Sequence, residues 1–347
     1  MRVSPRIVET SLALTALVLA SCGGGASQAE STENAGFLRN SGAAAETAPS
    51  TTEAPPAALS SVVTPPAVDT APVARDVARN EQSVDAKSGD AQPRDELALE
   101  QQGNAALQAS DFQRAAGLFS DLMLGEVAGT QPEDRAALAR WSVALDRAQQ
   151  GYRWNRRGAW PAVEMQVKEG DSLIAIRKRF VAEHPGMLVC TGLIARANQL
   201  ANERAIRPKE TLRIPTDPAS VLVDLSAMWI FYRHGNQVVA AWEVGIGRDG
   251  SATRPGAYTI GLKQKEPMWF PSGRTPVPYG DPQNPLGTRW MAWFQDGHEI
   301  SHLGFHGTND PSGVGRRVSE GCIRMRDAEV EALFDILPEG APVNVQQ

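Results

Sequence analysis

The chain has 347 residues, a net charge of −6 and three cysteines. This length allows two or three small domains, each with a core of its own. The acidic balance and the lack of an extended basic stripe argue against a nucleic-acid binder, and three cysteines are too few for a disulfide framework.

The N-terminal segment, MRVSPRIVETSLALTALVLASC, predicts export. Arg2 and Arg6 precede an apolar run that is too short to span a bilayer. The run ends in LASC, which resembles the lipobox of bacterial lipoproteins, where the signal is cut just before the cysteine. The resemblance implies that residues 1–21 are removed and that Cys22 becomes a lipidated first residue. Gly23 follows where an inner-membrane retention signal usually has Asp, so we expect an outer-membrane lipoprotein facing the periplasm. An ordinary secreted protein is the alternative.

Residues 22–93 consist mostly of Ala, Ser, Thr, Pro and acidic residues. Such a composition cannot bury enough apolar surface to offset its ordering entropy, so we predict a disordered tether. Residues 94–152 repeat small and apolar residues at helical spacing and resemble one tetratricopeptide-type helix pair with a further helix. Because one such unit is too little for a solenoid, this segment is a structural spacer, a dimer contact or a binding site for a protein partner.

Residues 163–216 show the order strand, helix, helix, strand. Gly170 and Asp171 turn the chain, and Ser172 or Asp171 caps the first of the two helices. The GDSL start, the ANQL after the second helix and the L-x-IP finish resemble a LysM module. That family binds glycans that contain N-acetylglucosamine, such as peptidoglycan. Cys190 lies in a stretch that is longer than usual for the family, and we predict that it is a small buried hydrophobe.

From residue 219 to residue 346 the pattern is that of strands, so the predicted fold class is multidomain α+β. SVLVDLSAMWIFYR and QVVAAWEVGIG alternate around an HGN turn and predict a hairpin, in which His234 is solvated. The stretch 267–285 contains too much proline for central strands and predicts an ordered loop. MAWFQDGHEISHLGFHGT returns to a strand pattern, and DAEVEALFDIL and APVNV predict a closing helix and strand.

A cysteine and a histidine form the candidate reactive pair. Strand alternation places His302, Gly304 and His306 on one face, and Cys322 follows His306 by sixteen residues. A cysteine is mostly thiol at neutral pH and becomes a strong nucleophile when a nearby imidazole takes its proton. Gly321 lets the backbone turn tightly and brings N–H groups near a developing oxyanion. The spacing alone also fits a structural histidine. No metal-ligand spacing supports a zinc site at Cys190 and Cys322, so we predict no metal and no cofactor.

The segments FHGT and GRRVSEGCIRM resemble the active-site motif of the L,D-transpeptidase (YkuD) family. That motif has His-Gly and, about sixteen residues later, Ser-His-Gly-Cys, an apolar residue and Asn or Arg. TRPGAYTI and NPLGTRWM resemble further marks of the family. The resemblance covers residues 219–346 and implies a mainly-β, β-sandwich-like catalytic domain that follows a small βααβ module and a short helical segment.

The same resemblance implies a mechanism. Cys322 attacks the carbonyl between the third residue of a peptidoglycan stem and D-Ala at position four, and His306 takes the thiol proton. An amine of another stem, a lipoprotein lysine, a D-amino acid or water then resolves the thioester. Gly321 and the Cys322 N–H line the oxyanion hole, while Ser319 orients the loop and Gly307 follows the base. Arg324 either holds a substrate carboxylate or makes a structural ion pair.

The chain departs from the motif at Glu320, where the family usually has His. A carboxylate so close to the thiol raises its pKa unless it pairs with a cation such as Arg316, Arg317 or Arg324. Because His306 is retained, we expect catalysis to survive, with His302 as a candidate replacement for the missing imidazole. The alternatives are a changed acceptor, a slow enzyme or a lapsed one.

The leading hypothesis is a membrane-anchored L,D-transpeptidase that forms 3–3 crosslinks or attaches another amine acceptor. A hydrolase of such linkages, of the L,D-carboxypeptidase or amidase type, is the second hypothesis, and a non-catalytic peptidoglycan scaffold is the third. The expected partners are peptidoglycan stems and glycan strands and, through the lipid on Cys22, the membrane, but no nucleic acid. A protein partner bound by residues 94–152 is a further alternative.

Overall fold

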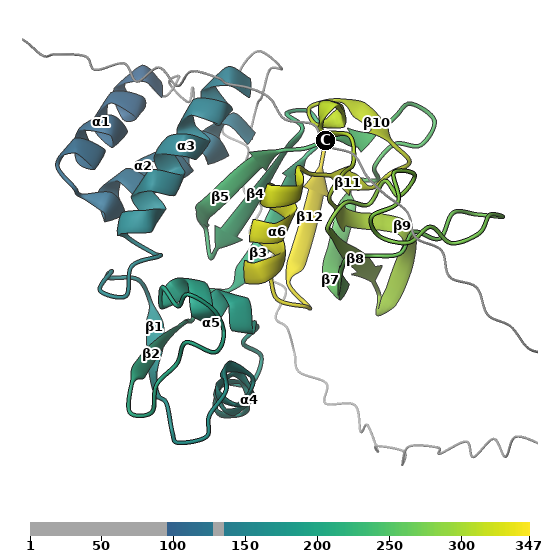
Figure 1. Ribbon diagram of the computed structural model, residues 1–347. Helices are drawn as coiled ribbons and strands as arrows, with labels where there is room; N and C mark the ends of the chain where they lie inside the picture. The colour runs from purple at the N-terminus through teal and green to yellow at the C-terminus, as the bar shows by residue number, and fades with distance from the viewer. Residues whose placement is uncertain (1–95, 128–134) are drawn as a thin grey trace, which may run out of the picture. The chain divides into compact units, whose positions relative to one another are not determined.

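The computed structural model describes residues 96–127 and 135–347, so the predicted signal peptide, Cys22 and the predicted tether lie outside the described residues. No helix in the described ranges is long and apolar enough to cross a membrane. The first elements are α1 (Glu96–Gln108), α2 (Phe112–Val127), α3 (Arg135–Gly151), β1 (Ala162–Gln166), α4 (Leu173–Glu183), α5 (Thr191–Ala197) and β2 (Thr211–Pro215). The strand-rich part follows with β3 (Ala219–Asp224), β4 (Trp229–His234), β5 (Gln237–Glu243), β6 (Ile246–Gly247), β7 (Gly256–Lys265), β8 (Arg289–Gln295), β9 (His298–His306), β10 (Arg317–Ser319), β11 (Ile323–Arg324), α6 (Asp327–Ile336) and β12 (Pro342–Gln346) (Figure 1).

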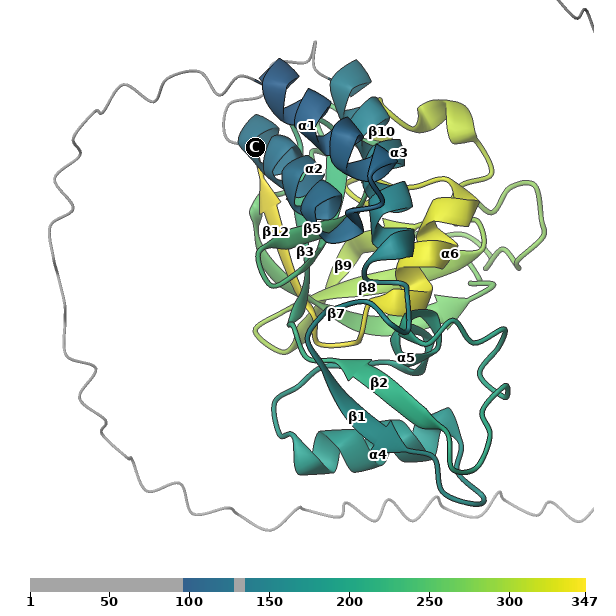
Figure 2. The ribbon, with the colours of Figure 1, turned by 90° about the vertical axis from the view of Figure 1, so that its left-hand side faces the viewer.

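A curled sheet of eight strands forms the C-terminal domain, which confirms the mainly-β prediction. Its strand order is β11-β9-β8-β7-β12-β3-β4-β5 (Figures 1 and 2). The final strand β12 enters the middle of the sheet, parallel to β3 and antiparallel to β7. At one edge, the short strand β11 pairs in parallel with β9. This edge therefore brings the segment around Cys322 beside the segment around His306.

The predicted hairpin holds only in part. SVLVDLSAMWIFYR forms two antiparallel strands, β3 and β4, because the chain turns between them at residues 225–228. Strands β4 and β5 then make the hairpin around the HGN turn. The expectation that His234 is solvated is wrong: the residue ends β4 and is only 2% exposed. The turn sequence around His234 does not reveal that Arg153, from a distant segment, packs against it.

The strands β3, β4 and β5 are covered on both faces. Leu222, Phe231 and Val238 belong to one apolar cluster with residues of α1, α2 and α3. Residues of alternate position on the same strands, such as Val221 and Tyr232, belong to another cluster, which includes α6. Strands buried on both faces have nearly continuous apolar sequences, as SVLVDL does. Helices α2 and α3 thus pack on the sheet, an arrangement that favours the structural interpretation of the segment 94–152.

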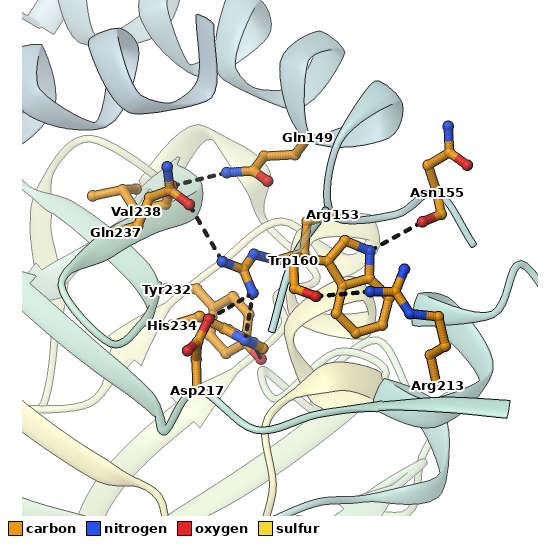
Figure 3. Close-up of polar contacts among 10 residues, drawn as sticks. All are labelled: Gln149, Arg153, Asn155, Trp160, Arg213, Asp217, Tyr232, His234, Gln237 and Val238. Carbon is orange, nitrogen blue, oxygen red and sulfur yellow. Dashed lines mark hydrogen bonds and ion pairs between the residues drawn. The ribbon is translucent and has the colours of Figure 1, made fainter. Parts of the chain in front are cut away.

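The edge strand β5 is protected by side chains of two helices. The Val238 N–H donates to Ser120 Oγ of α2 at 2.9 Å. The Val238 carbonyl accepts from Gln149 Nε2 of α3 at 3.2 Å, a contact drawn in Figure 3. An exposed edge strand offers unpaired N–H and C=O groups to other chains. These two contacts satisfy both backbone groups of Val238 within the protein.

A buried arginine fastens the segment after α3 to the sheet. Arg153 is 2% exposed and donates to Asp217 at 3.2 Å and to Gln237 at 3.3 Å (Figure 3). It also lies 3.4 Å from Nδ1 of His234. Because a guanidinium can only donate, Nδ1 of His234 must accept, and its Nε2–H donates to the Tyr232 hydroxyl at 2.7 Å. Burial, and then the charge of Arg153, hold the pKa of His234 well below its ordinary value.

The βααβ module, which we define as residues 162–215, has two antiparallel strands, β1 and β2, and two helices. Ser172 caps α4 by accepting from the Ala175 N–H at 3.2 Å. The start of α5 approaches the end of α6, where the Cys190 thiol donates to the Asp335 carbonyl at 3.2 Å. Gly192 lies beside that carbonyl, and a Cβ at this position would overlap it. The glycine therefore permits the close approach of the two helix ends.

Replacing Gly192 by alanine should destabilise the protein by about 1–3 kcal/mol, because the new methyl group must displace the backbone of α6. Urea unfolding followed by circular dichroism measures the change. Gly117→Ala in α2 is the matched control: its Cβ meets nothing within 4 Å, and alanine at a helical glycine adds roughly 0.5–1 kcal/mol of stability. Equal unfolding midpoints for Gly192→Ala and the wild type would show that the two helix ends do not meet as described.

Candidate active site

The sheet edge formed by β9 and β11 brings the segments that carry Cys322 and His306 side by side. In the parallel register of these strands, Ile323 lies opposite Phe305, and Arg324 lies opposite His306. Ile323 and Phe305 are fully buried and belong to the same apolar cluster. Side chains alternate along a strand, so Arg324 and His306 lie on the opposite face from Ile323 and Phe305. Cys322 directly precedes β11, so the candidate nucleophile adjoins the strand that pairs with the strand of the candidate base.

The thiol of Cys322 is half-buried and donates to a backbone carbonyl. Its Sγ lies 2.7 Å from the carbonyl oxygen of His302. Burial raises the pKa of the Cys322 thiol to about 12, against an opposing effect of the nearby Arg324 charge, while Glu320 raises it further. The resting cysteine is therefore a thiol, and attack on a carbonyl requires a base.

His302 contacts the Cys322 thiol through its backbone carbonyl. Its φ of +63° breaks the strand alternation that grouped it with Gly304 and His306, and its side chain is exposed. No hydrogen bond of its ring occurs among the residues that the structure describes. What lies next to the Cys322 thiol is the His302 carbonyl, whose position depends on a local backbone conformation that the alternating sequence did not reveal.

His306 has the tautomer that a base for the thiol needs. Its Nδ1 lies 2.6 Å from the Gly307 carbonyl, which can only accept, so Nδ1 carries the proton. The other nitrogen, Nε2, is left with a free electron pair. Burial, assisted by the Arg324 charge, lowers the pKa of His306 to about 4, although the bond to Gly307 opposes this effect. The ring packs near Trp290, with 6.0 Å between the ring centroids, and is neutral at physiological pH.

Two hydroxyl groups hold the loop before Cys322. Ser319 Oγ donates to the Cys322 carbonyl at 2.6 Å and accepts from the Gly321 N–H at 3.2 Å. From the other side, Thr253 Oγ1 donates to the Gly321 carbonyl at 2.8 Å and accepts from the Gly247 N–H. Gly321 has φ of +119°, a conformation that favours glycine. Of the two N–H groups predicted for the oxyanion hole, that of Gly321 thus already has an acceptor.

Asp327 holds the segment that follows His306. Its Oδ1 accepts from the backbone N–H of Thr288 at 3.2 Å and from that of Thr308 at 3.0 Å. A Cβ on either Gly307 or Gly287 would overlap this oxygen. The glycines of the HGT and LGT segments therefore give one carboxylate access to two loops. The sequence analysis missed Asp327, and the shared Gly-Thr of these segments was the only signal for it.

Comparison with known proteins assigns the family. A family model described as the L,D-transpeptidase catalytic domain, YkuD, matches residues 218–345. The protein named "Putative L,D-transpeptidase YqjB" of Bacillus subtilis is 33% identical over 130 residues, which cover 38% of this chain and 72% of that protein. The chain belongs to the L,D-transpeptidase family.

Further relatives agree with this assignment. "Putative L,D-transpeptidase YkuD" of Bacillus subtilis is 26% identical over 188 residues, which cover 52% of this chain and 98% of that protein. A crystal structure of an L,D-transpeptidase (Yku) from Stackebrandtia nassauensis is 22% identical, with a TM-score of 0.29, over 38% of this chain and 56% of that one. The family assignment of this L,D-transpeptidase rests on the sequence relatives.

The structure bears on the expectations for two charged residues near Cys322, Glu320 and Arg324. Glu320 pairs with Arg248 at 3.2 Å, so the proposed partners Arg316, Arg317 and Arg324 are wrong. The Glu320 and Arg248 side chains are 74% and 53% exposed, and such surface pairs contribute roughly 0–1 kcal/mol. Arg324 forms no ion pair within 4 Å in the described part of the chain, and its buried Nε has no hydrogen-bond partner there. No carboxylate of those residues therefore neutralises its charge.

The rate of alkylation should reflect the raised pKa of the half-buried Cys322 thiol. With its pKa at about 12, only about one Cys322 in ten thousand is a thiolate at pH 8, and that fraction rises about tenfold per pH unit up to pH 10. The rate of iodoacetamide labelling, followed by mass spectrometry of the peptide with Cys322, should rise in the same way. In urea-unfolded protein the same peptide is the control, and its rate should level off above about pH 8.5. A plateau near pH 9 in the folded protein would contradict the assigned burial.

Proposed function

We propose that this L,D-transpeptidase forms a thioester with a peptidoglycan stem peptide at Cys322 and transfers the acyl group to an amine. The observation that carries the proposal is the tautomer of His306, whose Nε2 is unprotonated and whose strand β9 pairs with β11, the strand that Cys322 directly precedes. A cysteine with a neighbouring oriented imidazole is the arrangement of nucleophilic acyl transfer.

The proton moves while the sulfur attacks. Because the pKa of the thiol is about 12 and that of His306 about 4, a stable thiolate–imidazolium pair would not form before attack. His306 Nε2 therefore accepts the proton as the Sγ–C bond to the stem carbonyl forms. The tetrahedral intermediate collapses when the C–N bond to D-Ala breaks, and the departing amine takes the proton from His306. The incoming amine reverses these steps, breaks the Sγ–C bond and restores the thiol.

The positive charge of Arg324 would stabilise negative charge that is present or develops during this reaction. Arg324 lies opposite His306 in the register of β11 and β9, and its charge lowers the pKa of both Cys322 and His306. Such a charge stabilises an anion near the thiol, which includes a substrate carboxylate or a developing oxyanion. The same charge disfavours the imidazolium form of His306, so protonated His306 is short-lived.

The rest of the chain would bring this chemistry to the cell wall. The βααβ module would bind glycan strands, in line with its resemblance to LysM modules. Lipid on Cys22 would anchor the protein in the outer membrane, on the periplasmic side. The packing of α2 and α3 on the sheet supports a structural role for the segment 94–152, so we propose no protein partner for it.

Intact-mass spectrometry after addition of a carbapenem tests the proposal. We expect one adduct of the mass of the drug on the wild-type protein and on Cys190→Ala, and none on Cys322→Ala. The acylated enzyme is next formed with a stem tetrapeptide and offered an amine or water alone. An amine-linked product supports transfer, whereas release of free acid at equal rates with and without amine would support the hydrolase. A folded protein with no adduct would support the scaffold and contradict the proposal.

A further inference from the structure

A cavity lies away from Cys322 and His306. It has a volume of about 460 Å³ and lies between the βααβ module, α6, β5 and α3. Helices α5 and α6 contact each other, as do α3 and β5 (Figures 1 and 2). None of the residues that line it belongs to the candidate active site. A cavity of this size holds a ligand of a few amino-acid residues.

Charged side chains of both signs line this cavity. Arg196 of α5 and Lys265 of β7 are the cations, and Asp335 of α6 is joined by Asp146 and Glu203 as the anions. Within residues 96–127 and 135–347, no ion pair under 4 Å joins any of these five side chains to another group. The cavity thus presents positive and negative charges that no ion pair within those residues neutralises, although Asp146 and Glu203 accept hydrogen bonds from Gln150 and Thr191.

Aromatic rings give the same cavity an apolar wall. The Arg196 guanidinium lies over the ring of Trp154, 5.4 Å from its centroid, which holds the cation at the cavity. Trp242 of β5 is half-buried, and the fully buried Ile336 lines the wall beside it. A neutral saccharide could stack on the exposed part of Trp242 and hydrogen-bond to the charged groups, but it would neutralise none of the five charges. A peptide with free carboxylate and ammonium groups could contact Trp242 and neutralise charges of both signs.

We propose that this cavity binds a short zwitterionic peptide, the stem of a peptidoglycan strand, in addition to the stem that reacts at Cys322. The peptide carboxylates pair with Arg196 and Lys265, and an ammonium group pairs with Asp335. This inference rests on the proposed function, because it takes the same substrate class. A second site on the same chain raises the effective concentration of stems near the thiol.

Binding to the full chain with Cys322→Ala, which excludes turnover, tests the proposal. The probe is the tetrapeptide L-Ala-γ-D-Glu-meso-diaminopimelate-D-Ala, titrated calorimetrically, and the comparison ligand is the neutral disaccharide without a stem. We expect two tetrapeptide sites. Combining Arg196→Glu with Lys265→Glu should weaken one of them at least tenfold and leave the other unchanged. Lys178→Glu, an exposed change on α4, is the matched control and should alter neither site.

Three results would overturn the inference: a single tetrapeptide site, two sites that ignore the charge reversal, or disaccharide binding that the reversal weakens equally. Carbapenem acylation of the same charge-reversed protein with Cys322 intact separates this inference from the proposed function. The charge-reversed protein should acylate normally, and a wild-type protein that acylates but has a single tetrapeptide site would contradict only the cavity proposal. If the wild-type protein were not acylated by the carbapenem, the proposed function would be contradicted. Equal melting temperatures of the variants and the parent exclude unfolding as the cause of lost binding.

Discussion

Replacing His306 by glutamine should slow acylation of Cys322 by a carbapenem about 10²- to 10⁴-fold, the usual contribution of a positioned general base. Glutamine has no basic nitrogen, and the thiol it leaves has a pKa near 12, so almost no nucleophile forms at neutral pH. The measurement is a single-turnover time course followed by intact mass. The adduct should have the same mass as in the wild type and should form more slowly.

His298→Gln is the matched control, because His298 begins the same strand β9 and is exposed. It should acylate at the wild-type rate. Both variants should keep the melting temperature of the parent to within a few degrees, so that a slow rate is not mistaken for loss of the fold. If the His306→Gln protein acylated as fast as the parent, another group would be the base, and His302 would be the first to examine.

Several parts of the fold could be predicted from sequence because they depend on local pattern. The strand β9, the strand pair β4 and β5 and the helix α6 each follow from alternation or helical spacing. Residue type and spacing within one motif identified Cys322 and His306 as the candidate nucleophile and the candidate base. A parallel pairing of β9 with β11 then brought their segments together, which the spacing allows but does not specify.

The features that could not be predicted depend on contacts between distant segments. His234 is buried because Arg153, from a separate segment before the sheet, packs against it. The partner of Glu320 is Arg248, which lies 72 positions away in sequence. The thiol contact arises from one residue, His302, in a left-handed conformation inside a strand. Period-two patterns carry no information on any of these contacts, since each is decided by which loops meet after folding.

Replacing Asp327 should have the largest effect on stability, because one of its oxygens accepts hydrogen bonds from two loops. Asp327→Ala removes the acceptor of the Thr288 and Thr308 N–H groups. Each donor left without a partner costs about 1–3 kcal/mol, so the protein should lose roughly 2–6 kcal/mol of unfolding free energy. Since Thr308 follows His306 by two residues, acylation of the surviving folded protein should also slow.

Asp327→Asn separates the hydrogen bonds from the charge. An asparagine keeps an oxygen acceptor of the same geometry, so it should retain most of the stability and most of the acylation rate that alanine removes. Urea unfolding and carbapenem acylation of both variants give the two readouts. If asparagine were as damaging as alanine, the negative charge of Asp327 would matter more than its two bonds. If alanine left both readouts unchanged, the loops that carry Gly287 and Gly307 would hold His306 in place without it, and the glycines would need another explanation.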